Sequence, residues 1–173
     1  IDGYEYIRAV DSDAFDEKFA FHPGRSAVIM RDGKALGILG EIHPEVQETY
    51  GIGVKTYVAK LNIPELMESA AGKITYQPLP KFPAVERDFA MLCDKDLPVG
   101  ALEKAITKGA GRLLERLELF DVYSGSQIPE GKKSVAYSVW LRSADATLSD
   151  KEIDTVNAAI IKNLESAGAE LRK

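Results

Sequence analysis

The sequence contains one cysteine, Cys93, and one tryptophan, Trp140, among its 173 residues. A single cysteine excludes an internal disulfide, and its alternating apolar context predicts a buried thiol, consistent with a reducing compartment. No stretch approaches the roughly 18 consecutive apolar residues of a membrane span, so we expect no membrane partner. A basic and then apolar leader is missing too, which argues against a signal peptide, and the start at Ile1 suggests a piece of a longer protein.

The sequence also lacks the excess of basic residues that a general nucleic-acid binder carries. Its net charge is −5, from 22 basic and 27 acidic residues. Residues 1–78 contain 8 basic and 12 acidic residues, whereas residues 79–173 contain 14 and 15. Any RNA binding by the nearly neutral second part must therefore use stacking and specific hydrogen bonds rather than bulk electrostatics.

Patterns for metal or phosphate binding are missing as well. His22 and His43 have no cysteines or carboxylates at metal-ligand spacing, so we expect no metal site. Residues 37–40 contain two glycines but lack the lysine and the strand-to-helix context of a phosphate loop, which favours a packing role. Arg25 follows Gly24 and could hold a nucleotide or an RNA phosphate, but a structural salt bridge is the favoured interpretation.

Residues 1–75 predict a small antiparallel α/β unit. Asp32-Gly33 lies between two apolar runs, residues 27–30 and 35–42, and is typical of a hairpin with a type I′ turn. Gly37 and Gly40 in the second run imply a bulge or a close backbone approach. The other expected elements are a short helix within residues 11–21, a loop at 21–27, a helix at 44–50, a strand at 54–63, and a helix at 64–71 that ends at Gly72.

Pro78, Pro80 and Pro83 lie within six residues and predict an extended linker over residues 76–84. The rest, residues 85–173, reads β-α-β-β-α-β. The expected elements are a strand at 85–93, a helix at 99–106 followed by two glycines, strands at 117–124 and 134–142, a helix opened by a Ser149–Glu152 capping box, and a strand at 169–172. This ferredoxin-like order covers one sheet face with both helices and leaves the other open, so the fold class is α+β.

Side chains of the hairpin at residues 117–141 alternate between two faces. One face collects a core-like set, Phe120, Val122, Val135, Tyr137, Val139 and Leu141. The opposite face collects aromatic, acidic and small polar residues, Asp121, Tyr123, Ser134, Ala136, Ser138 and Trp140. We expect the helices to cover the first set and the second to face solvent, where RNA-recognition modules of this topology stack bases.

Four motifs carry a resemblance to a known family: FPAVERD at 82–88, LFDVYSG at 119–125, GKKS at 131–134 and TLSDKE at 147–152. They resemble the ferredoxin-fold anticodon-binding domain that closes the β subunit of bacterial phenylalanyl-tRNA synthetase. FHPGRSA at 21–27 and LGEIHP at 39–44 are similar to the end of the same subunit's catalytic-like domain. The resemblance therefore covers nearly the whole chain, with a class II synthetase-like piece followed by the ferredoxin-like domain.

The resemblance implies a cytoplasmic α2β2 enzyme that joins phenylalanine to tRNA-Phe with ATP and magnesium, with catalysis on the α subunit and no DNA partner. Catalytic class II enzymes carry an ATP-binding arginine in their last glycine-rich strand and helix. Residues 51–66 contain no arginine, so we expect neither a catalytic residue nor a cofactor in this chain. The resemblance also implies that Asp121, Tyr123 and Ser134 bind the anticodon, the tyrosine by stacking and the others by hydrogen bonds to base edges.

Lys132, Lys133 and Trp140 are candidate further tRNA contacts on the same hairpin. The lysines alternatively belong to a solvated loop, and Trp140 alternatively docks on the first domain. A different interpretation of the whole open face is a protein-interaction module that docks on a neighbouring domain or subunit without RNA. The RNA interpretation requires Asp121 and Tyr123 to face solvent together with Ser134.

Overall fold

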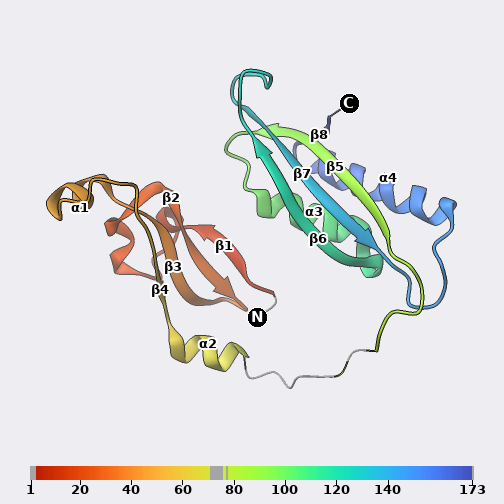
Figure 1. The fold of residues 1–173 in the computed structure, drawn as a ribbon, viewed down its shortest axis with the longest axis horizontal. Coiled ribbons are helices and arrows are strands. Elements are labelled where there is room, and N and C mark those ends of the chain that lie inside the picture. The colour runs from red at the N-terminus through yellow and green to blue at the C-terminus, as the bar shows by residue number, and fades with distance from the viewer. Residues whose placement is uncertain (1–2, 71–75, 77, 173) are drawn as a thin grey trace. The chain divides into compact units, whose positions relative to one another are not determined.

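The computed structural model describes residues 3–70, 76 and 78–172, and the chain divides into two compact units, Ile1–Tyr76 and Gln77–Lys173 (Figure 1). Each unit has its own hydrophobic core and its own four-stranded antiparallel sheet. Across the described residues, no helix combines the length and the apolar character needed to cross a membrane.

The first unit is a sheet with the strand order β1-β2-β3-β4. Its elements are β1 (Glu5–Arg8), two short 3-10 helices (Ala9–Asp11 and Asp16–Ala20), β2 (Phe21–Arg31), β3 (Lys34–Ile42), α1 (Pro44–Thr49), β4 (Tyr57–Leu61) and α2 (Ile63–Ala70). The predicted short helix within residues 11–21 is 3-10 rather than α-helical, and β4 is shorter than predicted. The predicted stop of the last helix at Gly72 lies outside the described residues.

The β2–β3 hairpin closes through the predicted turn, because Asp32 and Gly33 have φ values of 49° and 77°. Positive φ at both positions is what a type I′ turn requires. The predicted loop at residues 21–27 is wrong in part, since these residues belong to β2. The pairing of β2 with β3 nevertheless shifts register between the pairs Phe21–Ile42 and Ser26–Gly40, so residues 22–25 of β2 form a bulge. Pro23, which has no N–H to donate, therefore lies outside the regular hydrogen-bond ladder.

The second unit has the predicted β-α-β-β-α-β order and the strand order β6-β7-β5-β8 of a ferredoxin-like sheet. Its elements are β5 (Val85–Asp94), α3 (Val99–Ala110), a 3-10 turn (Gly111–Leu113), β6 (Leu114–Tyr123), β7 (Lys132–Leu141), α4 (Asp150–Ser166) and β8 (Ala169–Leu171). Both helices lie on the same side of this sheet (Figure 1) and share one core with its strands. The predicted open face is therefore confirmed.

Two helix predictions have different outcomes. The capping box of α4 is confirmed, because Ser149 Oγ accepts a hydrogen bond from the Glu152 N–H and the Glu152 carboxylate accepts one from the Ser149 N–H. Gly109, predicted to follow the first helix, instead lies inside α3. A Cβ on Gly109 would lie 2.6 Å from Ile160 Cα, so this glycine lets α3 and α4 approach closely.

Cys93 is fully buried in this core, as predicted, and burial raises the pKa of its thiol. The proline-rich stretch is tied to the same unit by Arg142, whose Nη1 donates to the Phe82 carbonyl and whose Nε lies 2.9 Å from the Glu115 carboxylate. The linker is therefore held to the second unit at Phe82, whereas residues 78–81 are exposed.

The prediction that Phe120 and Val122 lie in the core is wrong, because they are 55% and 48% exposed. Pairing with β7 shifts register between Leu119 and Asp121, so Phe120 is an extra residue in a β-bulge. In addition, β6 is an edge strand, and the core receives its Leu114 and Leu117 from the first half of that strand. The second half of β6 contributes no residue to this core.

Candidate nucleic-acid interface

The three predicted anticodon-binding residues lie on one face of the sheet. Asp121 pairs with Ala136, and Tyr123 pairs with Ser134, across the β6–β7 ladder. Directly opposed residues share a face of the sheet. Ser138 lies on this same face, whereas the buried Val135 and Tyr137 point to the opposite face. The face is the one without helices, so the bulge at Phe120 has left this part of the parity prediction intact.

The three residues differ in exposure. Asp121 is exposed and Tyr123 is 39% exposed, whereas Ser134 is only 5% exposed. The expectation that all three face solvent together is therefore wrong for Ser134. This serine lies on a central strand between Leu92 of β5 and Tyr123 of β6, two larger residues that flank its short side chain. Of the three residues, Ser134 is therefore the least accessible to a partner.

Lys132 and Lys133 lie on opposite faces, because they are adjacent on β7. Lys132 shares the face of Ser134 and forms a 2.7 Å ion pair with Asp94, whose hydrogen bond raises the pKa of the lysine. Lys133 Nζ donates to the Leu97 carbonyl ahead of α3. The structure thus brings Lys132 near the site but directs Lys133 to the helix side.

Trp140 shares the open face but lies at its far end, four residues from Ala136 and so roughly 13 Å away along β7. The Arg116 guanidinium lies 4.6 Å from the centre of the Trp140 ring, and Arg116 also pairs with Glu118. The predicted strand began at residue 117 and so left out Arg116, and the bulge at Phe120 also reverses the alternation between the two halves of β6. An Arg–Trp pair across two strands is the signal that could have found it.

Two cations on the open face are paired with carboxylates. Arg116 pairs with Glu118 and Lys132 pairs with Asp94. On β5, Asp88 accepts a 2.6 Å hydrogen bond from Ser138 Oγ. This charge pattern supports the sequence-based inference that the face has little electrostatic attraction for phosphates.

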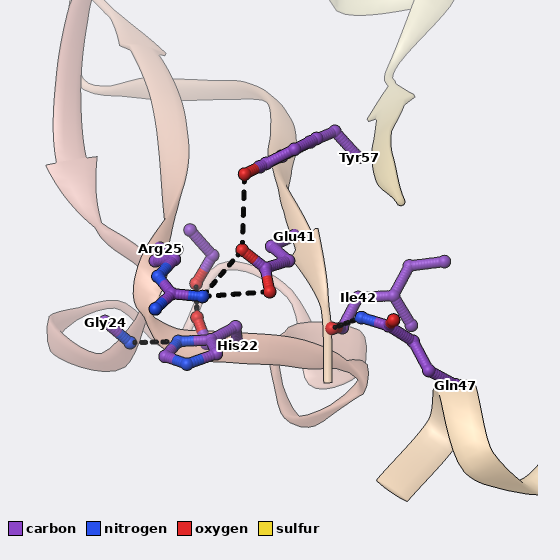
Figure 2. Close-up of polar contacts among 8 residues, drawn as sticks. His22, Gly24, Arg25, Glu41, Ile42, Gln47 and Tyr57 are labelled. Carbon is purple, nitrogen blue, oxygen red and sulfur yellow. Dashed lines mark hydrogen bonds and ion pairs between the residues drawn. The ribbon is translucent and has the colours of Figure 1, made fainter. Parts of the chain in front are cut away.

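Figure 2 shows a cluster of polar contacts around the buried Glu41 in the first unit. Arg25 Nη1 donates to both carboxylate oxygens of Glu41 at 2.9 Å, and the Tyr57 hydroxyl donates to Oε2 at 3.3 Å. Glu41 is only 3% exposed, and its hydrogen bond from Arg25 lowers the pKa of the carboxyl group. The salt bridge that was the favoured interpretation of Arg25 is therefore present.

Both histidines close local turns. His22 Nδ1 accepts a hydrogen bond from the Gly24 N–H at 3.0 Å (Figure 2), and His43 Nδ1 accepts one from the Glu45 N–H at the start of α1. In the described part of the chain, no group of three or more histidine, cysteine or acidic residues is placed to hold a metal ion.

The strand order and the helix-free face place the second unit among the ferredoxin-like βαββαβ domains. Comparison with protein-family profiles matches residues 80–172 to the ferredoxin-fold anticodon binding domain and residues 4–63 to the phenylalanyl tRNA synthetase beta chain CLM domain. The first match covers more than half of the chain, and the chain belongs to the ferredoxin-fold anticodon-binding domain family. The resemblance found in the sequence motifs is confirmed.

Curated relatives carry the name phenylalanine–tRNA ligase beta subunit. The relative from Clostridium tetani is 48% identical over 153 residues, which are 88% of this chain and 19% of the relative. The one from Symbiobacterium thermophilum is 45% identical over 153 residues, 88% of this chain and 17% of the relative. The Syntrophotalea carbinolica relative is 38% identical over 173 residues, 99% of this chain and 21% of the relative. The chain thus spans about a fifth of the length of these relatives.

Proposed function

We propose that this chain is the anticodon-binding end of a phenylalanine–tRNA ligase β subunit and that it recognises tRNA-Phe during aminoacylation. It comprises a catalytic-like piece (1–75), a linker (76–84) and the binding domain (85–173). The observation that carries the proposal is the β6–β7 register, which puts Asp121, Tyr123 and Ser134 on the uncovered sheet face of a domain from an anticodon-binding family.

In this proposal, Tyr123 provides a flat surface for one anticodon base. Base–aromatic stacking contributes about 1–3 kcal/mol per base and needs no positive charge. The Asp121 carboxylate only accepts hydrogen bonds when ionised, so it selects a base edge that presents N–H groups. Ser134 Oγ can both donate and accept, and because the residue is only 5% exposed, it can contact only a base edge that comes close to the sheet.

The proposed partners are tRNA-Phe and the α subunit, in an α2β2 enzyme of the cytoplasm. Phenylalanine activation with ATP and magnesium belongs to the α subunit. The contribution of this chain is to hold the anticodon loop, and thereby to place the other end of the same tRNA for the reaction.

A protein-interaction role for the open face is the second candidate. It is favoured by the pairing of Arg116 and Lys132 with carboxylates and by the burial of Ser134, which together reduce what RNA can contact. In that case the carboxylate of the exposed Asp121 would form an ion pair with a basic side chain, or accept a hydrogen bond from an amide, on another protein surface.

Substitution of Asp121 by alanine in the assembled ligase separates the two candidates. The RNA proposal predicts an increase of about tenfold in the KM for tRNA-Phe, because the variant loses roughly one charge-assisted hydrogen bond to the RNA. Phenylalanine activation without tRNA should not change. Asp154→Ala, which removes an exposed carboxylate from α4 on the helix side of the sheet, is the matched control. An unchanged KM in an intact complex would refute the RNA proposal, and loss of subunit or domain association would favour the second candidate.

A further inference from the structure

The hydroxyl end of the Tyr123 ring lies against Gly125, two residues further along the chain. A Cβ on Gly125 would lie 2.2 Å from Tyr123 Oη, 2.4 Å from Cζ and 3.1 Å from Cε1. The first two distances are far below any non-bonded carbon contact, so a side chain at position 125 and the ring cannot both occupy this space. Glycine is what allows the ring to lie here.

Backbone conformation does not explain this glycine. Gly125 is not among the residues with positive φ, whereas Gly131, at the other end of the same loop, has φ of 80°. A Cβ on Gly131 would meet no atom within 4 Å. The loop thus contains one glycine that its backbone requires and another whose missing side chain makes room for Tyr123.

Hydrogen bonds close the loop near both of its ends. The Gly125 carbonyl accepts a 2.9 Å hydrogen bond from the Ile128 N–H and begins a turn there. At the far end, the Gly131 carbonyl accepts a 2.9 Å hydrogen bond from the Lys95 N–H, which joins the loop to the end of β5. The loop is therefore closed by a turn that begins at Gly125 and is hydrogen-bonded to the residue after β5 at Gly131.

We propose that Gly125 is a positioning residue that orients the Tyr123 ring for base stacking. The inference rests on the proposed function, because it assigns the tyrosine to a tRNA base. A methyl group at position 125 would displace the free end of a side chain and leave the backbone in place. The ring would then have to reorient when a base binds, and the cost of that ordering would weaken binding.

A double-mutant cycle in the assembled ligase tests the inference. Gly125→Ala should raise the KM for tRNA-Phe about fivefold to tenfold and leave kcat at saturating tRNA unchanged. In a Tyr123→Ala background, where no ring remains to be displaced, the same change should alter KM less than about twofold. The control is Gly100→Ala in α3, where φ is not positive and a Cβ would meet nothing within 4 Å. If Gly125→Ala raises the KM for tRNA-Phe by the same factor with and without the Tyr123 ring, the inference is overturned.

An NMR measurement on the 173-residue chain separates this inference from the proposed function. The Gly125 protons should lose a ring-current shift in Tyr123→Ala, and the Tyr123 ring resonances should move in Gly125→Ala but not in Gly100→Ala. Unmoved Gly125 protons would show that the ring does not rest on this residue, which would overturn the positioning role. If the resonances move as expected while Tyr123→Ala leaves tRNA kinetics unchanged, the placement stands and the role in tRNA binding falls.

Discussion

Two aromatic rings on the open face of the second unit, those of Tyr123 and Trp140, have different surroundings. Trp140 already carries the Arg116 guanidinium at 4.6 Å from its ring centre. Tyr123 is 39% exposed and stands beside Asp121 and the deeper Ser134. At the scale of single residues, we therefore propose Tyr123 as the stacking residue, whereas Trp140 forms a cross-strand pair with Arg116.

Replacement of Tyr123 by alanine should weaken tRNA-Phe binding by the assembled enzyme by about 1–3 kcal/mol, which is roughly 5-fold to 150-fold. The fold should survive, since the ring is not part of the core. Tyr123→Phe keeps the stacking surface and should retain most of the affinity. Aminoacylation rates at limiting tRNA measure the effect, and kinetics identical to those of the unmodified enzyme would rule out a stacking role.

The Arg25–Glu41 pair predicts a pH effect in the first unit. The folded-state pKa of Glu41 is lowered, so its carboxylate stabilises the unit above the unfolded pKa of about 4.3 and loses that contribution as the pH falls through the folded value. Glu41→Gln should therefore reduce hydrogen-exchange protection of β2 and β3 at pH 7, with a smaller deficit near pH 3. Glu48→Gln, on the exposed side of α1, is the control. If the loss of protection in Glu41→Gln were larger near pH 3 than at pH 7, the stabilising role of the ionised Glu41 would be contradicted.

At the scale of elements, the order of helices and strands and the shared face of Asp121, Tyr123 and Ser134 follow from local sequence patterns. The Asp32-Gly33 turn and the Ser149–Glu152 capping box were predictable because each is determined by a few adjacent residues. The bulge at Phe120 was not, because it depends on how β6 pairs with a strand that follows a loop. The burial of Ser134 was missed for the same reason, since it depends on neighbours from two other strands.

Close packing of α3 on α4 gives a prediction that opposes helix propensity. Gly109→Ala should destabilise the second unit by about 1–3 kcal/mol, because its Cβ would press on the α4 backbone at Ile160. Gly100→Ala, in the same helix but with open space around it, should be neutral or stabilising by up to about 1 kcal/mol. Urea unfolding followed by Trp140 fluorescence compares the two, and a Gly109→Ala variant as stable as Gly100→Ala would show that the helices separate freely.

At the scale of the whole molecule, charge and size set the strength of binding. The second half of the chain has 14 basic and 15 acidic residues, and Arg116 and Lys132 on the open face are ion-paired. The chain is also only about a fifth as long as its curated relatives. We therefore expect the chain alone to bind tRNA weakly, and tight binding that is insensitive to salt would contradict this account.

The most direct test of the central claim is filter binding of this chain to two RNA stem-loops, one with the anticodon of tRNA-Phe and one with a changed anticodon. Edge recognition by Asp121 and Ser134 predicts weak but selective retention, with the cognate loop favoured about tenfold or more and the preference lost in Asp121→Ala. Equal retention of the two stem-loops by the unmodified chain would contradict the claim that this sheet face reads the anticodon.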